Sequence, residues 1–490
     1  MSGSALASFL ETDIDALLAP ASDGALERAV VKHVREVGAR VPAYRAFLAR
    51  AGIDAETIRT LADVRRLPPT SKDNYYKANS LPELSWDGAL SGWHAVALSS
   101  GSTGEPAAWP RSLEHELGVA VRFEQVLHDS FRGRERSTLA VICFALGSWV
   151  GGIYTAACMR HLAAKGYPLS VVTPGNQAAE IVRALRLLAP HYEQIVLFGY
   201  PPFLKDLIDT APALGFSWPS GRVRIVTAGE VFSEDWRSLV GRRLGSESPE
   251  RDSASLYGTA DAGVLACETP LSISIRRFLA QHRDLGRELF GDARLPTLCQ
   301  YDPVQRFFEV EDGSGNLLFT APGAIPLVRY RILDRGGIRS FHAMLELCRA
   351  HEWEPSGVEP VREMPFVWVF GRDHFAVSMD GANIYPEQIA GALERPPISD
   401  GVTGKFVLSI GQDEHLDPFL QCTVELLPGV AESAALAASI AADVRRLLEE
   451  ANSEFSHYVP AARRTPRVLL RPYRDAEYFP AGIKHRYTRA

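Results

Sequence analysis

Apolar residues recur at helical spacing near the start of the chain and in short runs after about residue 94. In residues 26–66, segments such as LERAVVKHVREV and AYRAFLARAGI predict a helical region that ends before the proline-bounded segment RLPPTSKDNYY. The later apolar runs end in small or polar residues and are often followed by helical stretches; they are HAVALSS, TLAVICFA, LSVVT, QIVLFG and RVRIVTAG. This alternation predicts βα units with parallel strands, whose carboxyl ends commonly form ligand sites.

The pattern changes in the last two hundred or so residues. Between 300 and 335, EDGSGNLLFT and PLVRYRILDRGG predict β structure with hairpin connections. After VWVFGRD at 367–373, the pattern predicts a strand, a turn and a helix, then two strands, a helix near 431–451 and a last strand, RVLLRP. We therefore predict an α/β fold with a large, multi-subdomain N-terminal domain at 1–370, which has parallel βα sheets and a β-rich part, and a small α+β C-terminal domain at 371–490.

Composition and charge exclude several classes of protein. The 490 residues are 46% hydrophobic and 23% charged, as in globular proteins, and the net charge of −7 gives no electrostatic reason to expect nucleic acid or an anionic membrane as partner. Six cysteines occur without a CxxC pair, which argues against a zinc site or a disulfide framework. The first residues, MSGSALASFLETDIDALL, do not resemble a signal peptide, and no apolar run reaches 18 residues. We expect a cytoplasmic protein.

A serine- and glycine-rich segment follows the apolar run HAVAL, where a predicted strand ends. Glycines let the backbone turn tightly around an anion, while hydroxyl and backbone N–H groups donate to phosphate oxygens. The segment matches neither the Walker loop nor the dinucleotide fingerprint. We interpret it as a cradle for the phosphates of ATP, with an ordinary Ser/Gly turn as the alternative, and assign the contacts to Ser99, Ser100, Gly101, Ser102, Thr103 and Gly104.

This segment resembles the phosphate-binding loop of the adenylate-forming superfamily, which includes acyl-CoA synthetases, luciferases and the adenylation domains of peptide synthetases. Within that superfamily, the chain is most similar to the phenylacetate-CoA ligase branch. LPPTSKDNYY resembles the proline-Thr-Lys motif of the branch, and CFALGSWVGGIYTA and VVTPGNQAAEIVRAL resemble its substrate-wall and Gly-Asn segments. The resemblance runs in order from about residue 65 to the C-terminus.

Two further motifs resemble the nucleotide-binding elements of the family. The residues Ala228, Gly229 and Glu230 resemble the element that lies against adenine, although they also suit an ordinary strand-to-helix turn. The sequence LYGTAD at 256–261 resembles the motif Tyr-Gly-x-Ser/Thr-Glu. The resemblance implies that the nucleotide is framed, and its α-phosphate approached, by Tyr257, Gly258 and Thr259.

The carboxylate that closes this motif is Asp261, where the family has glutamate. The resemblance implies that it binds Mg²⁺, and an oxygen ligand suits that hard cation. The shorter side chain of aspartate can act through a water molecule. Glu268 is similar to a downstream acidic position of the branch, with a solvated loop acid as the alternative.

The ribose site is expected in the motif YRILD at 330–334, which resembles Tyr-Arg-x-x-Asp. The resemblance implies that Asp334 binds both ribose hydroxyls, and one carboxylate can accept two hydrogen bonds from a cis-diol. The alternative is that Asp334 caps a turn formed by Arg335, Gly336 and Gly337.

The last two motifs resemble the mobile end of the family. GRDH at 371–374 is similar to the hinge around which the C-terminal domain rotates between two half-reactions, and the following DGANIYPEQI resembles its sequel. Arg372 is assigned to the nucleotide site, and either Asp373 or His374 is the expected pivot. Near the end, GIKHR resembles the terminal Gly-Lys-x-x-Arg region, so Lys484 is the candidate catalytic lysine, with a basic, fraying tail as the alternative.

The expected reaction joins an acid to AMP with ATP and Mg²⁺, releases pyrophosphate, and transfers the acyl group to coenzyme A (CoA). An acyl pocket is assigned to Trp149, Gly151 and Tyr200, although aromatic residues after strands are usually core. Other acceptors, such as an amine or a carrier protein, and an unusual acid such as nitrite stay open. Two rival readings are a nucleotide-binding homologue without catalysis and a kinase-like ATP enzyme. The sequence does not specify the acid or the oligomeric state.

Overall fold

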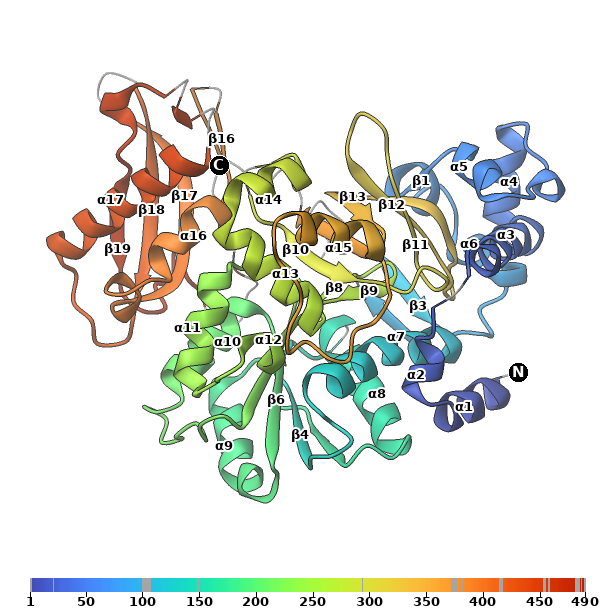
Figure 1. The fold of residues 1–490 in the computed structure, drawn as a ribbon, viewed down its shortest axis with the longest axis horizontal. Coiled ribbons are helices and arrows are strands. Elements are labelled where there is room, and N and C mark those ends of the chain that lie inside the picture. The colour runs from blue at the N-terminus through green and yellow to red at the C-terminus, as the bar shows by residue number, and fades with distance from the viewer. Residues whose placement is uncertain are drawn as a thin grey trace.

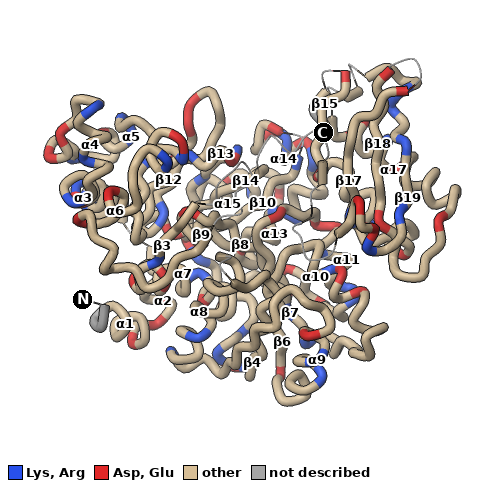
Figure 2. Tube along the Cα trace, turned by 180° about the vertical axis from the view of Figure 1, so that it is seen from behind, with Lys and Arg blue, Asp and Glu red and all other residues tan. Residues whose placement is uncertain are grey.

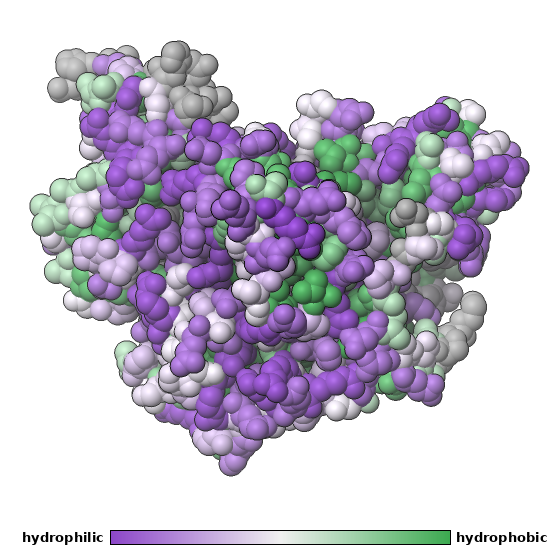
Figure 3. All heavy atoms as spheres, viewed as in Figure 1, coloured by the Kyte–Doolittle hydropathy of each residue, from purple (hydrophilic) through white to green (hydrophobic). Residues whose placement is uncertain are grey.

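The computed structural model describes residues 2–20, 22–98, 107–147, 150–292, 294–371, 377–380, 382–413, 417–452, 455–456, 459–480, 485 and 487–488. Figure 1 shows one large sheet in the middle, a helical N-terminal region at one side and a smaller group of strands and helices at the other. Lys and Arg are interspersed with Asp and Glu along the trace (Figure 2). The face in Figure 3 is largely hydrophilic, with hydrophobic side chains in scattered groups. Among the described helices, none is long and apolar enough to cross a membrane.

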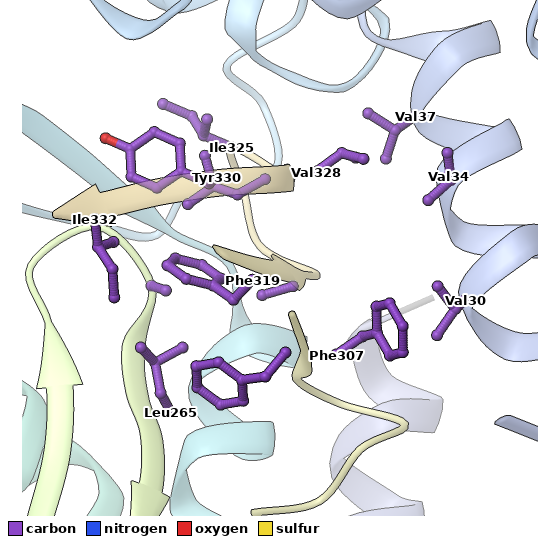
Figure 4. Packing of buried hydrophobic residues seen from close by; sticks show 14 of the residues in the cluster. Val30, Val34, Val37, Leu265, Phe307, Phe319, Ile325, Val328, Tyr330 and Ile332 are labelled. Carbon is purple, nitrogen blue, oxygen red and sulfur yellow. The ribbon is translucent and has the colours of Figure 1, made fainter. Parts of the chain in front are cut away.

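The N-terminal region is helical, as its periodicity predicts. Side-chain caps begin several of its helices: Ser22 accepts from the backbone N–H of Ala25, and Thr60 and Asp63 form a capping box. The helices are α1 (Ser2–Glu11), α2 (Ile14–Leu17), α3 (Asp23–Arg40), α4 (Pro42–Arg50), α5 (Leu61–Arg66) and α6 (Leu81–Leu84). Val30, Val34 and Val37 of α3 point toward Phe307 and other buried residues of the β-rich part (Figure 4). The helical region is thereby packed onto the rest of the molecule.

Five parallel strands form one half of the central sheet, in the order β5-β4-β6-β7-β8. They are β4 (Thr138–Ile142), β5 (Leu169–Val172), β6 (Gln194–Gly199), β7 (Val223–Ala228) and β8 (Ser253–Thr259). The parallel βα units predicted from the apolar runs are present, with one exception. The run HAVALSS forms β2 (Ala95–Leu98), which pairs antiparallel with β3 (Ala108–Arg111) in a separate two-stranded ribbon.

Helices cover both faces of the parallel strands. In β4, Ala140 and Ile142 pack on one side, while Leu139 and Val141 pack on the other, because successive side chains of a strand point to opposite faces. The first face is covered mainly by α7 (Leu113–Gln125) and α8 (Val150–Ala164). The second is covered by α9 (Ala178–Leu188), α10 (Pro201–Thr210) and α11 (Glu234–Leu244). Burial on both faces explains why these strands are continuously apolar.

Antiparallel strands complete the sheet beyond β8, in the order β9-β10-β14-β13-β12-β11, and β1 (Thr70–Ser71) pairs with β13. The residues 311–315 connect β11 and β12 as a hairpin, as their turn-rich sequence predicts. The strands are β9 (Gly263–Cys267), β10 (Thr297–Gln300), β11 (Phe307–Val310), β12 (Asn316–Ala321), β13 (Leu327–Arg339) and β14 (Phe366–Gly371). The helices between them are α13 (Pro270–Gln281), α14 (Arg283–Phe290) and α15 (Phe341–Ala350), while the short helix α12 (Pro249–Asp252) precedes β8.

The residues after β14 form α+β structure with a hydrophobic core of their own. The elements are β15 (Val377–Met379), β16 (Ala382–Ile384), α16 (Glu387–Leu393), β17 (Val402–Gln412), β18 (Pro418–Leu426), α17 (Ala434–Ala451) and β19 (Arg467–Arg471). The strand order β17-β18-β19 is antiparallel and then parallel. The predicted α/β fold is confirmed, while the boundary between residues 370 and 371 stays a prediction.

Candidate active site

A cleft of about 2640 Å³ lies beyond the carboxyl ends of β7 and β8 and is bounded on its far side by residues of α16 and β17. Ligand sites in α/β proteins commonly form at this edge of a sheet. The cleft brings together predicted site residues that are far apart in sequence: Gly151, Tyr200, Gly229, Glu230, Tyr257, Gly258, Thr259, Asp261 and Asp334. Ala228, the last residue of β7, is half-buried beside it.

The turn after β7 has the backbone shape that the sequence suggested. Gly229 has a φ of +83°, a backbone conformation that residues other than glycine rarely adopt. It is exposed, and Glu230 beside it is half-buried. Because no side chain projects from Gly229, a flat ring can approach the backbone here. This geometry suits the adenine position that the family resemblance implies.

The carboxyl end of β8 presents three predicted residues to the cleft. A Cβ atom on Gly258 would lie 2.7 Å from the carbonyl oxygen of Gly263, so a glycine is required where β8 approaches β9. The hydroxyl of Thr259 accepts a 3.1 Å hydrogen bond from the backbone N–H of Ala262, which closes the turn that contains Asp261. Thr259 and Asp261 are both half-buried and line the cleft.

Asp334 faces the same space from β13. Leu333 has a φ of +62°, and this local distortion exposes Leu333 and buries Asp334 to 7% exposure. The hydroxyl of Tyr257 donates a 3.0 Å hydrogen bond to Oδ2 of Asp334. The alternative of a cap on a turn is wrong, because Arg335, Gly336 and Gly337 continue β13 and pair with β14.

One side of the cleft is formed by small and aromatic residues. The ring of Tyr200 packs edge-to-face on Phe144, with 5.0 Å between the ring centroids, and burial raises the pKa of Tyr200. Gly151, in the first turn of α8, lines the cleft, whereas Gly152 is buried against the carbonyl of Ala145. Tyr200 and Gly151, the two described residues of the predicted acyl pocket, therefore both line the cleft.

Several predicted residues lie outside the described ranges. They are Ser99, Ser100, Gly101, Ser102, Thr103, Gly104, Trp149, Arg372, Asp373, His374 and Lys484. Their described neighbours lie at the cleft: Leu98, Val150, Gly371 and His485 all line it. His485 donates a 2.8 Å hydrogen bond from Nε2 to the carbonyl of Phe406, and the backbone N–H of Leu408 donates to the carbonyl of Tyr487.

Glu268 does not lie at the cleft, and the alternative of a solvated loop acid is wrong. It is 1% exposed, and both its oxygens accept from Arg237, at 2.7 and 2.9 Å. It also accepts a 2.8 Å hydrogen bond from the backbone N–H of Ser255 in β8. Glu268 is thus part of a buried ion pair that supports β8 from behind.

Charged residues that the motifs did not indicate join the two walls of the cleft. Lys205, on α10, bonds with Asp209 at 2.9 Å and with the carbonyl of Val402 at 3.4 Å, and burial lowers the pKa of Lys205 to about 7. Ser233 donates to Glu394, and burial raises the pKa of Glu394 to about 7. These contacts connect α10 and α11 with α16 and β17. No local sequence pattern signals them, because the partners are more than 150 residues apart.

The donor set of the cleft suits one magnesium ion that is shared with a substrate. Among the described residues, no group of three or more His, Cys, Asp or Glu side chains could hold a metal ion. Mg²⁺ in nucleotide enzymes is typically held by one or two carboxylates together with phosphate oxygens and water. Asp261, at the cleft surface beside Thr259, can supply such a carboxylate.

Comparison with known proteins agrees with the motifs. No protein-family model matches the chain. The chain is similar to the phenylacetate-coenzyme A ligase of Aromatoleum evansii, with 21% identity over 403 residues that cover 81% of this chain and 79% of that enzyme. It is also similar to the phenylacetate-coenzyme A ligase of Escherichia coli (strain K12), with 22% identity over 408 residues that cover 81% of this chain and 80% of that enzyme.

Solved structures share the fold. The 2-hydroxyisobutyryl-CoA ligase in the postadenylation state in complex with R3-HIB-AMP superposes with a TM-score of 0.66 at 15% identity, covering 96% of this chain and 90% of that chain. The same ligase in complex with 2-HIB-AMP and CoA in the thioesterification state gives a TM-score of 0.54 at 16% identity, with 96% and 90% covered. The predicted resemblance to the phenylacetate-CoA ligase branch and the predicted fold are confirmed.

Proposed function

We propose that this chain, similar in sequence to phenylacetate-CoA ligases and in fold to an acyl-CoA ligase, is an AMP-forming acid–CoA ligase. It uses ATP to convert a carboxylic acid, with aryl acids among the candidates, into an acyl-AMP and then transfers the acyl group to CoA. The observation that supports this most is the convergence of Tyr257, Thr259, Asp261 and Asp334 in one cleft. Tyr257 and Thr259 come from β8, Asp261 from the turn that follows it and Asp334 from β13, and all four match the family's nucleotide motifs in order.

The nucleoside is held at the end of the sheet. Adenine lies over the backbone of Gly229, where the absence of a side chain permits close approach. The carboxylate of Asp334 accepts hydrogen bonds from the ribose hydroxyls, and the bond from Tyr257 orients that carboxylate. The burial of Asp334 favours this use, because water competes less for a buried acceptor.

The phosphates lie between the carboxyl end of β8 and the segment that follows β2. Thr259 uses its oxygen to accept from Ala262, which leaves its hydroxyl proton free to donate to the α-phosphate. Asp261 holds Mg²⁺, which neutralises charge on the phosphate oxygens when it is bound. The serine- and glycine-rich segment at 99–104 receives the remaining phosphate oxygens through its hydroxyl and N–H groups.

The acid binds beside Gly151 and Tyr200, with its carboxylate directed at the α-phosphorus. The reaction needs alignment and charge stabilisation more than a protein nucleophile, because the carboxylate itself attacks phosphorus. We assign the cation at this point to Lys484. The packing of its neighbours supports this assignment over a fraying tail, since His485 and Tyr487 contact β17. Rotation of residues 371–490 about Asp373 or His374 then admits CoA.

The test is product identification. The purified protein is incubated with ATP, Mg²⁺ and a panel of aryl, fatty and inorganic acids, with and without CoA, and the products are identified by mass. We expect AMP, pyrophosphate and a thioester, with acyl-AMP accumulating when CoA is omitted. Formation of ADP would contradict the proposal, and so would an absence of turnover with every acid. Acyl-AMP without a thioester would reject CoA as the acceptor.

A further inference from the structure

Three consecutive peptide carbonyls in the turn after β8 accept hydrogen bonds from two side chains of a distant segment. Arg111 donates from Nη2 to the carbonyl of Ala260 and, at 3.2 Å, from Nη1 to the carbonyl of Asp261. His115 places its Nε2 atom 3.0 Å from the carbonyl of Ala262. The turn 260–262 is thus held from behind, on the side away from the cleft, since neither Arg111 nor His115 lines the cleft.

The positions of these two side chains follow from the junction between β3 and α7. Arg111 is the last residue of β3, and Ser112 caps α7 by accepting from the backbone N–H of His115 at 3.3 Å. The same β3 pairs with β2 through Leu98 and Ala108. The residues 99–107, which include the predicted phosphate loop, connect these two strands in sequence. The end of β3 and the start of α7 therefore follow the predicted phosphate loop closely in sequence and also contact the turn that contains Asp261.

Arg111 and His115 are buried, and the geometry of their donor groups matches the carbonyls that they contact. Arg111 is 3% exposed and His115 is 5% exposed, so water cannot replace their donors. The guanidinium of Arg111 spans two neighbouring carbonyls, which a single ammonium group cannot reproduce with the same geometry. Because a carbonyl only accepts, His115 must carry its proton on Nε2. Burial lowers the pKa of His115 well below its ordinary value, which agrees with the neutral form of the ring.

We propose that Arg111 and His115 are positioning residues, which hold the backbone at 260–262 so that the carboxylate of Asp261 faces Mg²⁺ and the phosphates that leave as pyrophosphate. This inference rests on the proposed function. Neither side chain touches the reacting groups; both act through the peptide carbonyls. The consequence differs between the two half-reactions, because pyrophosphate has left before the thiol attacks. Loss of either contact therefore weakens metal-dependent nucleotide binding and adenylation, and spares thiolysis of an acyl-AMP that is supplied ready-made.

The test uses variants in matched pairs. His115→Gln can still donate from the position of Nε2, whereas His115→Asn is too short to reach the carbonyl. Arg111→Lys keeps the positive charge but loses the planar guanidinium group that donates to two carbonyls at once. Arg224→Lys is the control, because Arg224 is also buried and is ion-paired, at 3.0 Å with Asp252, without contact to the turn. Titration calorimetry with α,β-methylene-ATP, with and without Mg²⁺, measures binding independently of turnover, and the melting temperature of each variant is recorded.

We expect Arg111→Lys and His115→Asn to reduce the Mg²⁺-dependent gain in affinity and the adenylation rate by about tenfold or more, the effect typical of residues that orient metal ligands. We expect His115→Gln and Arg224→Lys to stay close to the parent protein, and all variants to thiolyse supplied acyl-AMP normally. The inference would be overturned if Arg111→Lys and His115→Asn lost as much nucleotide affinity without Mg²⁺, and as much thiolysis activity, as they lose with Mg²⁺. It would also be overturned if the gain in affinity on adding Mg²⁺ were unchanged in these two variants. If the parent protein binds Mg²⁺ and the analogue without adenylating any acid, the proposed function fails while the binding test still decides the positioning role.

Discussion

The hydroxyl of Tyr257 donates a hydrogen bond of 3.0 Å to Oδ2 of Asp334, and this contact joins the end of β8 to the middle of β13. The two residues are 77 positions apart in sequence. The hydrogen bond helps to orient a buried carboxylate that lines the cleft. One carboxylate can accept two hydrogen bonds from the cis-diol of a ribose.

Replacement of Asp334 tests this ribose assignment. We expect Asp334→Ala to raise the KM for ATP by roughly tenfold to a hundredfold, since hydrogen bonds to a charged group contribute about 1.5–3 kcal/mol. The variant should also lose the preference for ATP over 2′-deoxyATP. Tyr257→Phe is the milder comparison: it removes the hydrogen bond to Asp334 but keeps the carboxylate, so we expect a change of about fivefold from a loss near 1 kcal/mol. A preference for ATP that survives in Asp334→Ala would place the ribose elsewhere.

The carboxylate of Asp261 is the proposed protein ligand of Mg²⁺. We expect Asp261→Asn to raise the Mg²⁺ concentration for half-maximal pyrophosphate release by about tenfold or more, because a neutral amide binds a hard cation weakly. Asp261→Glu, which restores the residue type of the family motif, should keep magnesium dependence near that of the parent protein. Asp73→Asn is the control, because Asp73 also lines the cleft but is 82% exposed and pairs with Lys77. If Asp261→Asn responds to Mg²⁺ like Asp73→Asn, Asp261 is not the ligand.

The local sequence predicts the parallel strands β4 to β7, but it does not predict the contacts between distant segments. The buried parallel strands are continuously apolar, and the turn after β7 needs glycine, so both are visible in the sequence. The burial of Asp334 depends on the positive φ angle of Leu333, and a leucine in the sequence does not indicate such a backbone conformation. No local pattern indicates the contacts of Arg111 and His115, because their partners at 260–262 lie about 150 residues away.

The same limit explains the incorrect expectations. The local sequence around Glu268 allows a solvated loop acid, but Arg237, 31 residues before it in the chain, is folded against it as a buried partner. The run HAVALSS has the pattern of a strand, yet pattern alone does not specify whether a strand joins the main sheet or a separate ribbon. Pairing partners are determined by tertiary structure, which a single sequence specifies only indirectly.

Stability should depend on pH through Glu394, which accepts from Ser233 and has Asp235, Lys205 and Arg395 as its charged neighbours. Burial raises the pKa of Glu394 from 4.5 to about 7 in the folded state. The folded protein therefore binds more protons than the unfolded chain between these values, so the stabilisation from this group is complete below about pH 4.5 and is lost as the pH rises through 7. The loss amounts to about 3 kcal/mol at most.

Glu394→Gln tests this pH dependence, because glutamine resembles the protonated acid at every pH. We expect the melting temperature of the variant, relative to the parent protein, to increase between pH 5 and pH 8. Glu477→Gln provides the control, since Glu477 also lines the cleft and belongs to the same C-terminal part. A difference in melting temperature that does not vary with pH would show that Glu394 is ionised throughout this range.

Two adjacent glycines at the start of α8 offer a matched test of the acyl pocket. A Cβ atom on Gly151 would meet the ring of Phe144 at 3.5 Å, an ordinary contact, and would project at the cleft surface. A Cβ atom on Gly152 would lie 2.3 Å from the backbone oxygen of Ala145, which cannot move away easily.

We expect Gly151→Ala to fold normally and to shift the ratio of kcat/KM values from larger toward smaller acids by about tenfold, the effect of one methylene-sized change in a pocket. Gly152→Ala should lower the melting temperature instead and affect all acids alike. Measurement of kcat/KM across a series of acids of increasing size, together with melting curves, separates the two effects. An unchanged ratio in Gly151→Ala would mean that the acid binds away from α8.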